Sequence, residues 1–297
     1  MSAARAPRDK AASIRQRLLN LAKARGEEFQ LMLDRYALER LLYRLSVSDM
    51  RADFLLKGAL LFAIWFDEPH RPTRDADMLG VGPPDEARLA GIIRQLCNAD
   101  VDDAMAYDTG SIRVRPIREN ASYGGLRMNL LGMLGNARCH VQIDVGFGDA
   151  VTPDPTDIDF PCLLEDSPVP RLRIYPRETV CAEKLEAITQ LGITNTRMKD
   201  FFDLLVLARE GAMERAAVSR AIAATFERRG TPLPEALPVG LTAEFAGDAQ
   251  RRELWESFLK RNRIEAQALA AVIDEIADYF GPALGGAREV HAKRRSK

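Results

Sequence analysis

The sequence has few of the residues that bind transition metals. Its 297 residues include three histidines and four cysteines, and the cysteines are too widely scattered to suggest a zinc site. Scattered cysteines of this kind are typical of reduced thiols in a cytoplasmic protein. A metal ion bound by this chain is therefore expected to be a hard cation with oxygen ligands.

Long apolar runs are also missing. The longest extends from Ala59 to Phe66, whereas a helix needs about 20 apolar residues to cross a bilayer. The N-terminal segment has Arg15 and Arg17 where a secretory signal would be apolar. These absences predict a cytoplasmic location and no membrane partner.

The chain has almost no net charge, −1 at pH 7, but its charges are unevenly distributed. Residues 1–25 contain seven basic residues and one acid, whereas residues 144–166 contain seven acids and no base. A basic terminus can bind a polyanion such as RNA. A solvated terminus without a partner would have the same composition, so both interpretations stay open.

The spacing of apolar residues divides the chain into two parts, which predicts an α+β fold with a mixed sheet. Residues 1–170 mix helical and alternating patterns, and residues 171–297 show helical spacing only. At the end of the first part, residues 149–170 are rich in Asp and Pro; this segment is expected to be irregular and to mark the boundary between the two parts. The expected helices cover residues 9–25, 28–47, 58–66, 85–97, 178–191, 198–210, 214–228, 250–262 and 265–280, and the expected strands cover 54–57, 77–81, 111–118, 125–134 and 138–147.

Asp75 and Asp77 are the most informative pair of residues. Separated by one position, they point to the same side of an extended segment. Two carboxylates on one side repel each other unless a cation lies between them, and Mg²⁺ is the usual one. Because Asp-x-Asp also occurs by chance in solvated turns, the surrounding sequence has to decide.

A candidate phosphate-binding turn precedes that pair. In Lys57-Gly58-Ala59, a glycine stands where a strand is expected to turn into a helix. Glycine lets a ligand approach the backbone closely, and the first N–H groups of a helix favour phosphate. Many strand-to-helix turns use glycine for geometry only, so this signal is weak by itself.

Asp144 is a candidate third acid. The alternation in residues 138–147 predicts a half-buried strand with Asp144 on its polar face. From an adjacent strand, Asp144 could join Asp75 and Asp77 as a metal ligand. Three acids beside a phosphate-binding turn are what metal-assisted nucleotidyl transfer requires.

Three charged residues of the second part lie in apolar surroundings. Lys184 shares the apolar face of its expected helix, so its ammonium either contacts a ligand such as a triphosphate or reaches solvent at the edge of the core. Asp200 and Asp203 stand one turn apart near a helix start, where the helix dipole favours acids whatever their function. Asp203 lies among apolar residues and needs a partner, for which Lys184 and Lys199 are candidates.

Four segments, taken in order, resemble the AbiEii/AbiGii nucleotidyltransferase toxins, a group that includes the MenT-like type IV toxins. They are Leu56-Lys57-Gly58-Ala59, Arg71-Pro72-Thr73-Arg74-Asp75-Ala76-Asp77, Lys184-Leu185 and Arg197-Met198-Lys199-Asp200-Phe201-Phe202-Asp203-Leu204. The resemblance spans about residues 30–280. Four motifs in a fixed order are much more specific than any one of them.

The resemblance implies a polymerase-β-like nucleotidyltransferase fold with a helical C-terminal lobe. It also implies a toxin that uses an NTP and Mg²⁺ or Mn²⁺ to add nucleotides to the 3′ acceptor end of tRNA, which blocks translation, under the control of an AbiEi-like antitoxin. The implied site comprises Lys57, Gly58, Ala59, Lys184 and Asp200 for the nucleotide, Asp75 and Asp77 for metal and catalysis, and Lys184 and Asp203 for catalysis.

One departure from the family and two other function classes remain. The family commonly has Gly-Gly or Gly-Ser where this chain has Gly58-Ala59; the backbone N–H groups are unchanged, so nucleotide binding is expected to survive. The same fold could act on a small molecule or a protein hydroxyl, or the chain could be a non-catalytic nucleotide-binding module. Arg113 and Arg115, which share one face of their strand, favour a large anionic acceptor.

Overall fold

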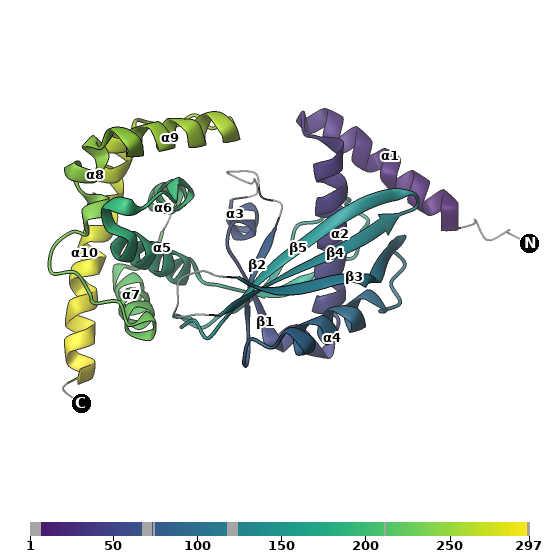
Figure 1. Ribbon diagram of the computed structural model, residues 1–297, viewed down its shortest axis with the longest axis horizontal. Coiled ribbons are helices and arrows are strands. Elements are labelled where there is room, and N and C mark those ends of the chain that lie inside the picture. The colour runs from purple at the N-terminus through teal and green to yellow at the C-terminus, as the bar shows by residue number, and fades with distance from the viewer. Residues whose placement is uncertain (1–6, 67–72, 74, 118–123, 211, 296–297) are drawn as a thin grey trace, which may run out of the picture. The chain divides into compact units, whose positions relative to one another are not determined.

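The structure, a computed structural model, describes residues 7–66, 73, 75–117, 124–210 and 212–295 (Figure 1). The chain forms two compact units. The first comprises residues 1–148 and 156–174, and the second comprises residues 149–155 and 175–297. Residues 149–155, which the sequence analysis assigned to the first lobe, thus group with the second unit.

The first unit is built on a mixed sheet of seven strands in the order β3-β4-β5-β2-β1-β7-β6. Its strands are β1 (Phe54–Lys57), β2 (Ala76–Gly80), β3 (Met105–Ile117), β4 (Gly125–Leu134), β5 (Ala137–Phe147), β6 (Thr156–Asp159) and β7 (Arg171–Ile174). The pairs β2–β5 and β1–β7 are parallel, and the other neighbours are antiparallel. The mixed sheet confirms the predicted α+β class.

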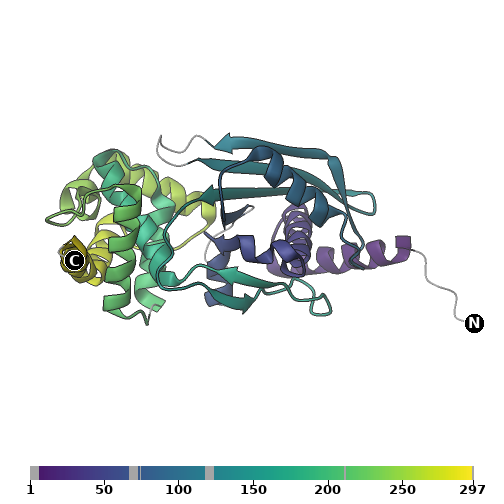
Figure 2. The same cartoon turned by 90° about the horizontal axis from the view of Figure 1, so that it is seen from below.

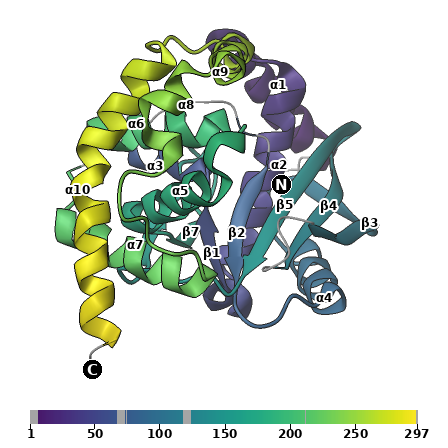
Figure 3. The same ribbon diagram turned by 60° about the vertical axis from the view of Figure 1, so that its left-hand side comes forward.

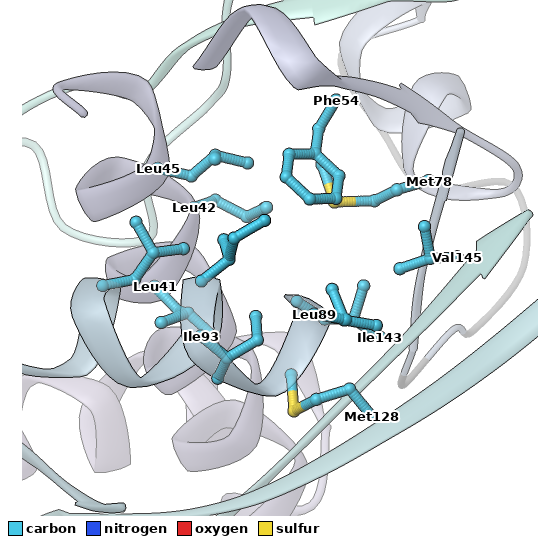
Figure 4. A pocket seen from close by; sticks show the side chains of 12 residues that line it. Leu41, Leu42, Leu45, Phe54, Met78, Leu89, Ile93, Met128, Ile143 and Val145 are labelled. Carbon is cyan, nitrogen blue, oxygen red and sulfur yellow. The ribbon is translucent and has the colours of Figure 1, made fainter. Parts of the chain in front are cut away.

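Two helices, α2 (Phe29–Ser46) and α4 (Glu86–Cys97), cover one face of this sheet (Figure 2). Apolar side chains from both helices and from four strands meet there (Figure 4). The void among them is about 10 Å³ and has no polar lining, so it is too small and too apolar to hold an ordered water. The apolar side chains that meet between the helices and the sheet are Leu41, Leu42, Leu45, Phe54, Met78, Leu89, Ile92, Ile93, Leu96, Met128, Ile143 and Val145.

Two shorter elements and one helix complete the first unit. Helix α1 (Pro7–Arg25) packs against α2 and ends at Gly26, whose φ of +64° stops the helix as predicted. A 3₁₀ helix, η1 (Asp49–Asp53), leads into β1, and α3 (Leu60–Trp65) follows it. Of the basic N-terminal residues, Arg5 lies outside the described residues.

The second unit consists of helices. They are α5 (Arg177–Leu191), α6 (Met198–Glu210), α7 (Arg215–Arg229), α8 (Ala243–Gly247), α9 (Ala249–Asn262) and α10 (Leu269–Arg295), with 3₁₀ helices η2 (Gly192–Thr194) and η3 (Val239–Leu241). Helix α10 runs along α6, α7 and α8 (Figure 3). Residues 149–155 are attached to this unit because Thr152 and Thr179 exchange two hydrogen bonds of 2.9 and 2.8 Å.

Four sequence predictions about elements were wrong. Residues 171–297 were expected to be helical only, but they begin with strand β7. Helix α3 begins at Leu60 rather than at Gly58, because Gly58 has a φ of +76° that an α-helix cannot contain. Residues 149–170 include strand β6, which is ordered by pairing with β7. Helix α10 continues past Pro282, where the sequence predicted its end at residue 280.

All four cysteines are free, in agreement with the prediction of reduced thiols. Within the described ranges, no helix combines the length and the apolar character that crossing a membrane requires.

Candidate active site

A line of charged residues crosses five neighbouring strands of the first unit. Lys57 pairs with Asp77, Asp77 with Asp144, Asp144 with Arg127, and Arg127 with Arg115. Directly paired residues of adjacent strands point to the same face of a sheet. These five residues, here called the charged row, therefore lie on the face opposite to α2 and α4, since Met78 and Val145, the next residues along their strands, belong to the buried core.

Gly58 and Asp77 are in direct contact at one end of the charged row. A Cβ atom added to Gly58 would lie 2.8 Å from both Cβ and Cγ of Asp77 and would overlap its Oδ2. Only glycine fits here, because the positive φ and the contact with Asp77 both exclude a side chain. The prediction that the turn at Gly58 and the strand of Asp77 come together is confirmed.

Asp75 lies just before β2 and Ala59 just before α3. Asp75 and Asp77 are both half-buried, and the hydroxyl of Thr73 donates a hydrogen bond of 3.2 Å to the carbonyl oxygen of Asp75. Ala59 is buried. Three residues of the second family motif, Arg71, Pro72 and Arg74, lie outside the described residues.

Asp144 is bound by an arginine that the sequence analysis did not identify. Arg127 donates from Nε to Asp144 Oδ1 at 2.8 Å and from Nη2 to Oδ2 at 2.7 Å. The Asp144 side chain is 18% exposed, and that of Arg127 is 44% exposed. In the part of the chain that the structure describes, no group of three His, Cys, Asp or Glu side chains is arranged to hold a metal ion. Asp144 is thus beside Asp77, but its carboxylate is engaged by Arg127.

The outer end of the charged row is basic. Arg113 and Arg115 are exposed on β3, as the alternation predicted. Among the described residues, Arg113 donates to the backbone carbonyls of Gly110 and Ile112, at 2.8 Å each. No hydrogen bond or ion pair joins Arg115 to any described residue.

Lys184, Asp200 and Asp203 form an ion-paired cluster in the second unit. Lys184 Nζ lies 2.8 Å from Asp200 Oδ1 and 2.7 Å from Asp203 Oδ2. Arg197 Nε donates to Asp200 Oδ2 at 2.6 Å. Both carboxylates are 2% exposed and the lysine 12%, so α5 and α6 hold the three groups out of water. Of the two candidate partners of Asp203, Lys184 and Lys199, the structure pairs Asp203 with Lys184.

Electrostatics fixes the charge state of Asp200. Burial alone raises the pKa of a carboxyl group, but the positive charges of Lys184 and Arg197 outweigh it and lower the pKa of Asp200 to about 2. Two cations and two carboxylates balance in this cluster, which is how buried charges are usually tolerated.

A second, partly buried cluster was also missed by the sequence analysis. Arg229 Nη1 donates to Glu186 at 2.8 Å, and its Nη2 lies 3.0 Å from Asp149 and 3.4 Å from Glu183. Although burial works against a charged guanidinium, the carboxylates of Glu183 and Asp149 raise the pKa of Arg229 above its ordinary value. This cluster ties the segment 149–155 to α5 and α7, a structural role.

A family model described as nucleotidyl transferase AbiEii toxin, type IV TA system, matches residues 40–279. Two solved structures are similar at 14% identity: JHP933 from Helicobacter pylori, with a TM-score of 0.49 over 90% of this chain and 97% of that one, and a candidate nucleotidyltransferase from H. pylori, with 0.48 over 88% and 97%. Comparison with curated proteins gives no match.

Proposed function

The chain belongs to the AbiEii family of nucleotidyl transferase toxins from type IV toxin–antitoxin systems, and we propose that it adds a nucleoside monophosphate from an NTP to the 3′ end of tRNA. In this reaction the terminal ribose hydroxyl attacks the α-phosphorus, a phosphate ester bond forms, and pyrophosphate leaves. The observation that carries the proposal is the charged row with Gly58 packed on Asp77. The mixed sheet that presents this row supports a polymerase-β-like fold.

The donor set fits a hard divalent cation. Asp75 and Asp77 offer only carboxylate oxygens, and the turn at Gly58 packs directly against Asp77. We assign Mg²⁺ or Mn²⁺ binding to these two residues, with Asp144 as a third ligand. When bound, such a metal neutralises the triphosphate and favours ionisation of the attacking hydroxyl.

The lysines are assigned to the nucleotide. Lys57 stands beside Asp77 in the charged row, and the turn formed by Gly58 and Ala59 can approach a phosphate through its backbone. We assign Lys184 to the triphosphate as a point charge. Asp200 and Asp203 then orient the Lys184 ammonium, because each accepts one of its hydrogen bonds.

The basic part of the sheet favours a nucleic-acid acceptor over a small molecule or a protein hydroxyl. Arg113, Arg115 and Arg127 lie on β3 and β4 with exposed or part-exposed side chains. A strip of guanidinium groups matches a phosphate backbone, whereas a small acceptor needs no such strip. Membership in a type IV system implies a cognate antitoxin, and we propose that it is AbiEi-like.

Transfer of label from each of the four α-³²P NTPs tests the function. The protein is incubated with Mg²⁺ or Mn²⁺ and tRNA, then with an aminoglycoside or a protein acceptor in place of tRNA. We expect label at tRNA 3′ ends, lost in Asp77→Asn and Asp75→Ala but kept in Asp100→Asn, which removes an exposed carboxylate from the same unit.

Three outcomes would contradict the proposal. Label on the drug or protein but not on tRNA would favour the other acceptors. Absence of label with every nucleotide and acceptor would exclude transfer under these conditions. Growth arrest that persists in cells expressing Asp75→Ala would favour a non-catalytic nucleotide-binding module.

A further inference from the structure

Arg127 engages the carboxylate of Asp144, which is the third ligand of the proposed metal site. Asp144 lies opposite Asp77 on the neighbouring parallel strand, where paired residues are roughly 5 Å apart. Both oxygens of Asp144 accept from the Arg127 guanidinium, at 2.8 and 2.7 Å. A cation at Asp77 would therefore meet a guanidinium charge instead of a third carboxylate.

We propose that Arg127 is a positioning residue that keeps the Asp144 carboxylate from binding the metal ion. When the nucleic acid binds, one of its phosphates replaces Asp144 as the hydrogen-bond partner of Arg127. This inference rests on the proposed function, since it assigns the acceptor a role in completing the site. Arg127 contacts the acceptor backbone and Asp144 contacts the metal, so binding of the two ligands is coupled.

The chemistry of arginine makes the exchange of partners feasible. A guanidinium fork forms the same two parallel hydrogen bonds with a phosphate as with a carboxylate, so a phosphate can replace both bonds between Arg127 and Asp144. Its side chain is 44% exposed, so it can turn toward solvent without leaving an apolar core. Asp144, at 18% exposed, stays in the strand and is uncovered by the movement.

A second observation identifies the ligand as an anion. Arg115 is directly opposite Arg127 on β3, and like charges in that position repel each other. Arg115 has no hydrogen-bond or ion-pair partner among the described residues. Two adjacent guanidinium groups, one of them unengaged, suit a phosphodiester that bridges them.

The coupling works in both directions. With Arg127 withdrawn, Asp77 and Asp144 are two facing carboxylates, and this arrangement raises the affinity for a divalent cation. By thermodynamic linkage, the cation must raise the affinity for the nucleic acid by the same factor. The device would limit NTP turnover in the absence of an acceptor.

Metal binding without NTP tests the inference, because no transfer can occur. Electron paramagnetic resonance measures Mn²⁺ binding to the wild type and to four variants: Arg127→Gln, Arg127→Lys, Asp144→Asn and the double variant Arg127→Gln with Asp144→Asn. Arg115→Gln is the matched control, since it removes the same charge one strand away. We expect Arg127→Gln to bind Mn²⁺ about tenfold more tightly than wild type, the size of effect seen when groups that orient metal ligands are changed.

The other variants show whether Asp144 transmits the effect. The gain should disappear in the double variant and be smaller in Arg127→Lys. Arg115→Gln should change the affinity less than about twofold, because it leaves the pair of Arg127 and Asp144 intact. An equal gain in Arg127→Gln and Arg115→Gln would overturn the inference, as would a gain that persists in the double variant. Circular dichroism confirms that each variant is folded.

Fluorescence anisotropy of a short single-stranded RNA tests the reciprocal effect. Divalent cations ordinarily weaken RNA binding by screening, so an affinity that rises with Mn²⁺ in the wild type but falls in Asp144→Asn would support the coupling. Weakening in both proteins would overturn it. If the variants change Mn²⁺ binding as expected but no nucleotide is transferred to tRNA, only the proposed acceptor is refuted. If nucleotide is transferred to tRNA but the variants do not change Mn²⁺ binding as expected, only this inference is refuted.

Discussion

Gly58 lies against the carboxylate of Asp77 with no room for a methyl group between them. The turn after β1 and the strand β2 are thereby fixed to each other at the point where nucleotide and metal are assigned. Position 58 has two independent reasons to be glycine, its φ of +76° and this contact.

Gly58→Ala should slow nucleotide transfer about 100-fold. The methyl group must displace Asp77, and a shift of about 1 Å in a catalytic group reduces rates roughly 100-fold. The left-handed backbone adds a strain of about 1–2 kcal/mol. Gly91→Ala is the control, because Gly91 lies exposed in α4 with nothing within 4 Å of an added Cβ. Wild-type transfer rates in Gly58→Ala, measured with labelled NTP, would show that Asp77 need not be held there.

Lys184→Met should destabilise the second unit as well as stop transfer. It leaves Asp200 and Asp203 without their shared cation, and breaking a buried ion pair from one side costs about 3–5 kcal/mol. Urea unfolding measures this loss. Because loss of activity in an unstable protein does not identify a ligand contact, the variant Lys184→Met with Asp203→Asn is needed as well.

The double variant separates the two roles of Lys184. It removes one charge of each sign, so much of the stability should return. If Lys184 contacts the triphosphate, transfer should stay lost. Transfer that returns together with stability would make Lys184 a structural residue only.

Acid should weaken the second unit through Asp200. Its pKa is about 2 in the folded protein against an ordinary 3.8, so the unfolded chain binds more protons between these values. The stabilisation is fully present above about pH 4 and is lost as the pH falls toward 2. The shift corresponds to about 2 kcal/mol. Urea unfolding at pH 5 and pH 3 should show a smaller pH effect for Asp200→Asn than for wild type. Equal slopes would contradict the assignment.

The sequence predicted best what depends on local patterns. The alternation in β4 and β5, the helix spacing of α6 and the stop at Gly26 are local, and each matched the structure. The position of Arg127 opposite Asp144 could have been predicted from the sequence, because the two-residue turn between Leu134 and Ala137 sets the register of β4 and β5.

Long-range pairing could not be predicted in the same way. Strand β6 has four residues in a Pro-rich segment, and only its hydrogen bonds to β7 make it a strand. The parallel register of β2 and β5, which brings Asp77 beside Asp144, joins distant parts of the chain without a turn that sets it. The carboxylates around Arg229 converge from two segments, residues 149–155 and α5, for the same reason.

The continuation of α10 past Pro282 gives the last prediction. Proline removes one helix hydrogen bond, so packing against α7 has to offset the loss. That packing is close at Gly286, where an added Cβ would lie 2.6 Å from Ser219 Oγ, and the Ser219 hydroxyl donates to the Ala283 carbonyl at 3.0 Å.

Gly286→Ala should therefore destabilise the protein by about 1–3 kcal/mol through overpacking. Gly285→Ala is the matched control, since its nearest neighbour would be the Arg288 side chain at 3.7 Å, and alanine there should stabilise the helix by up to about 1 kcal/mol. Thermal unfolding of the two variants measures the difference. If both shift the midpoint in the same direction, close packing against Ser219 is not what holds α10 together beyond Pro282.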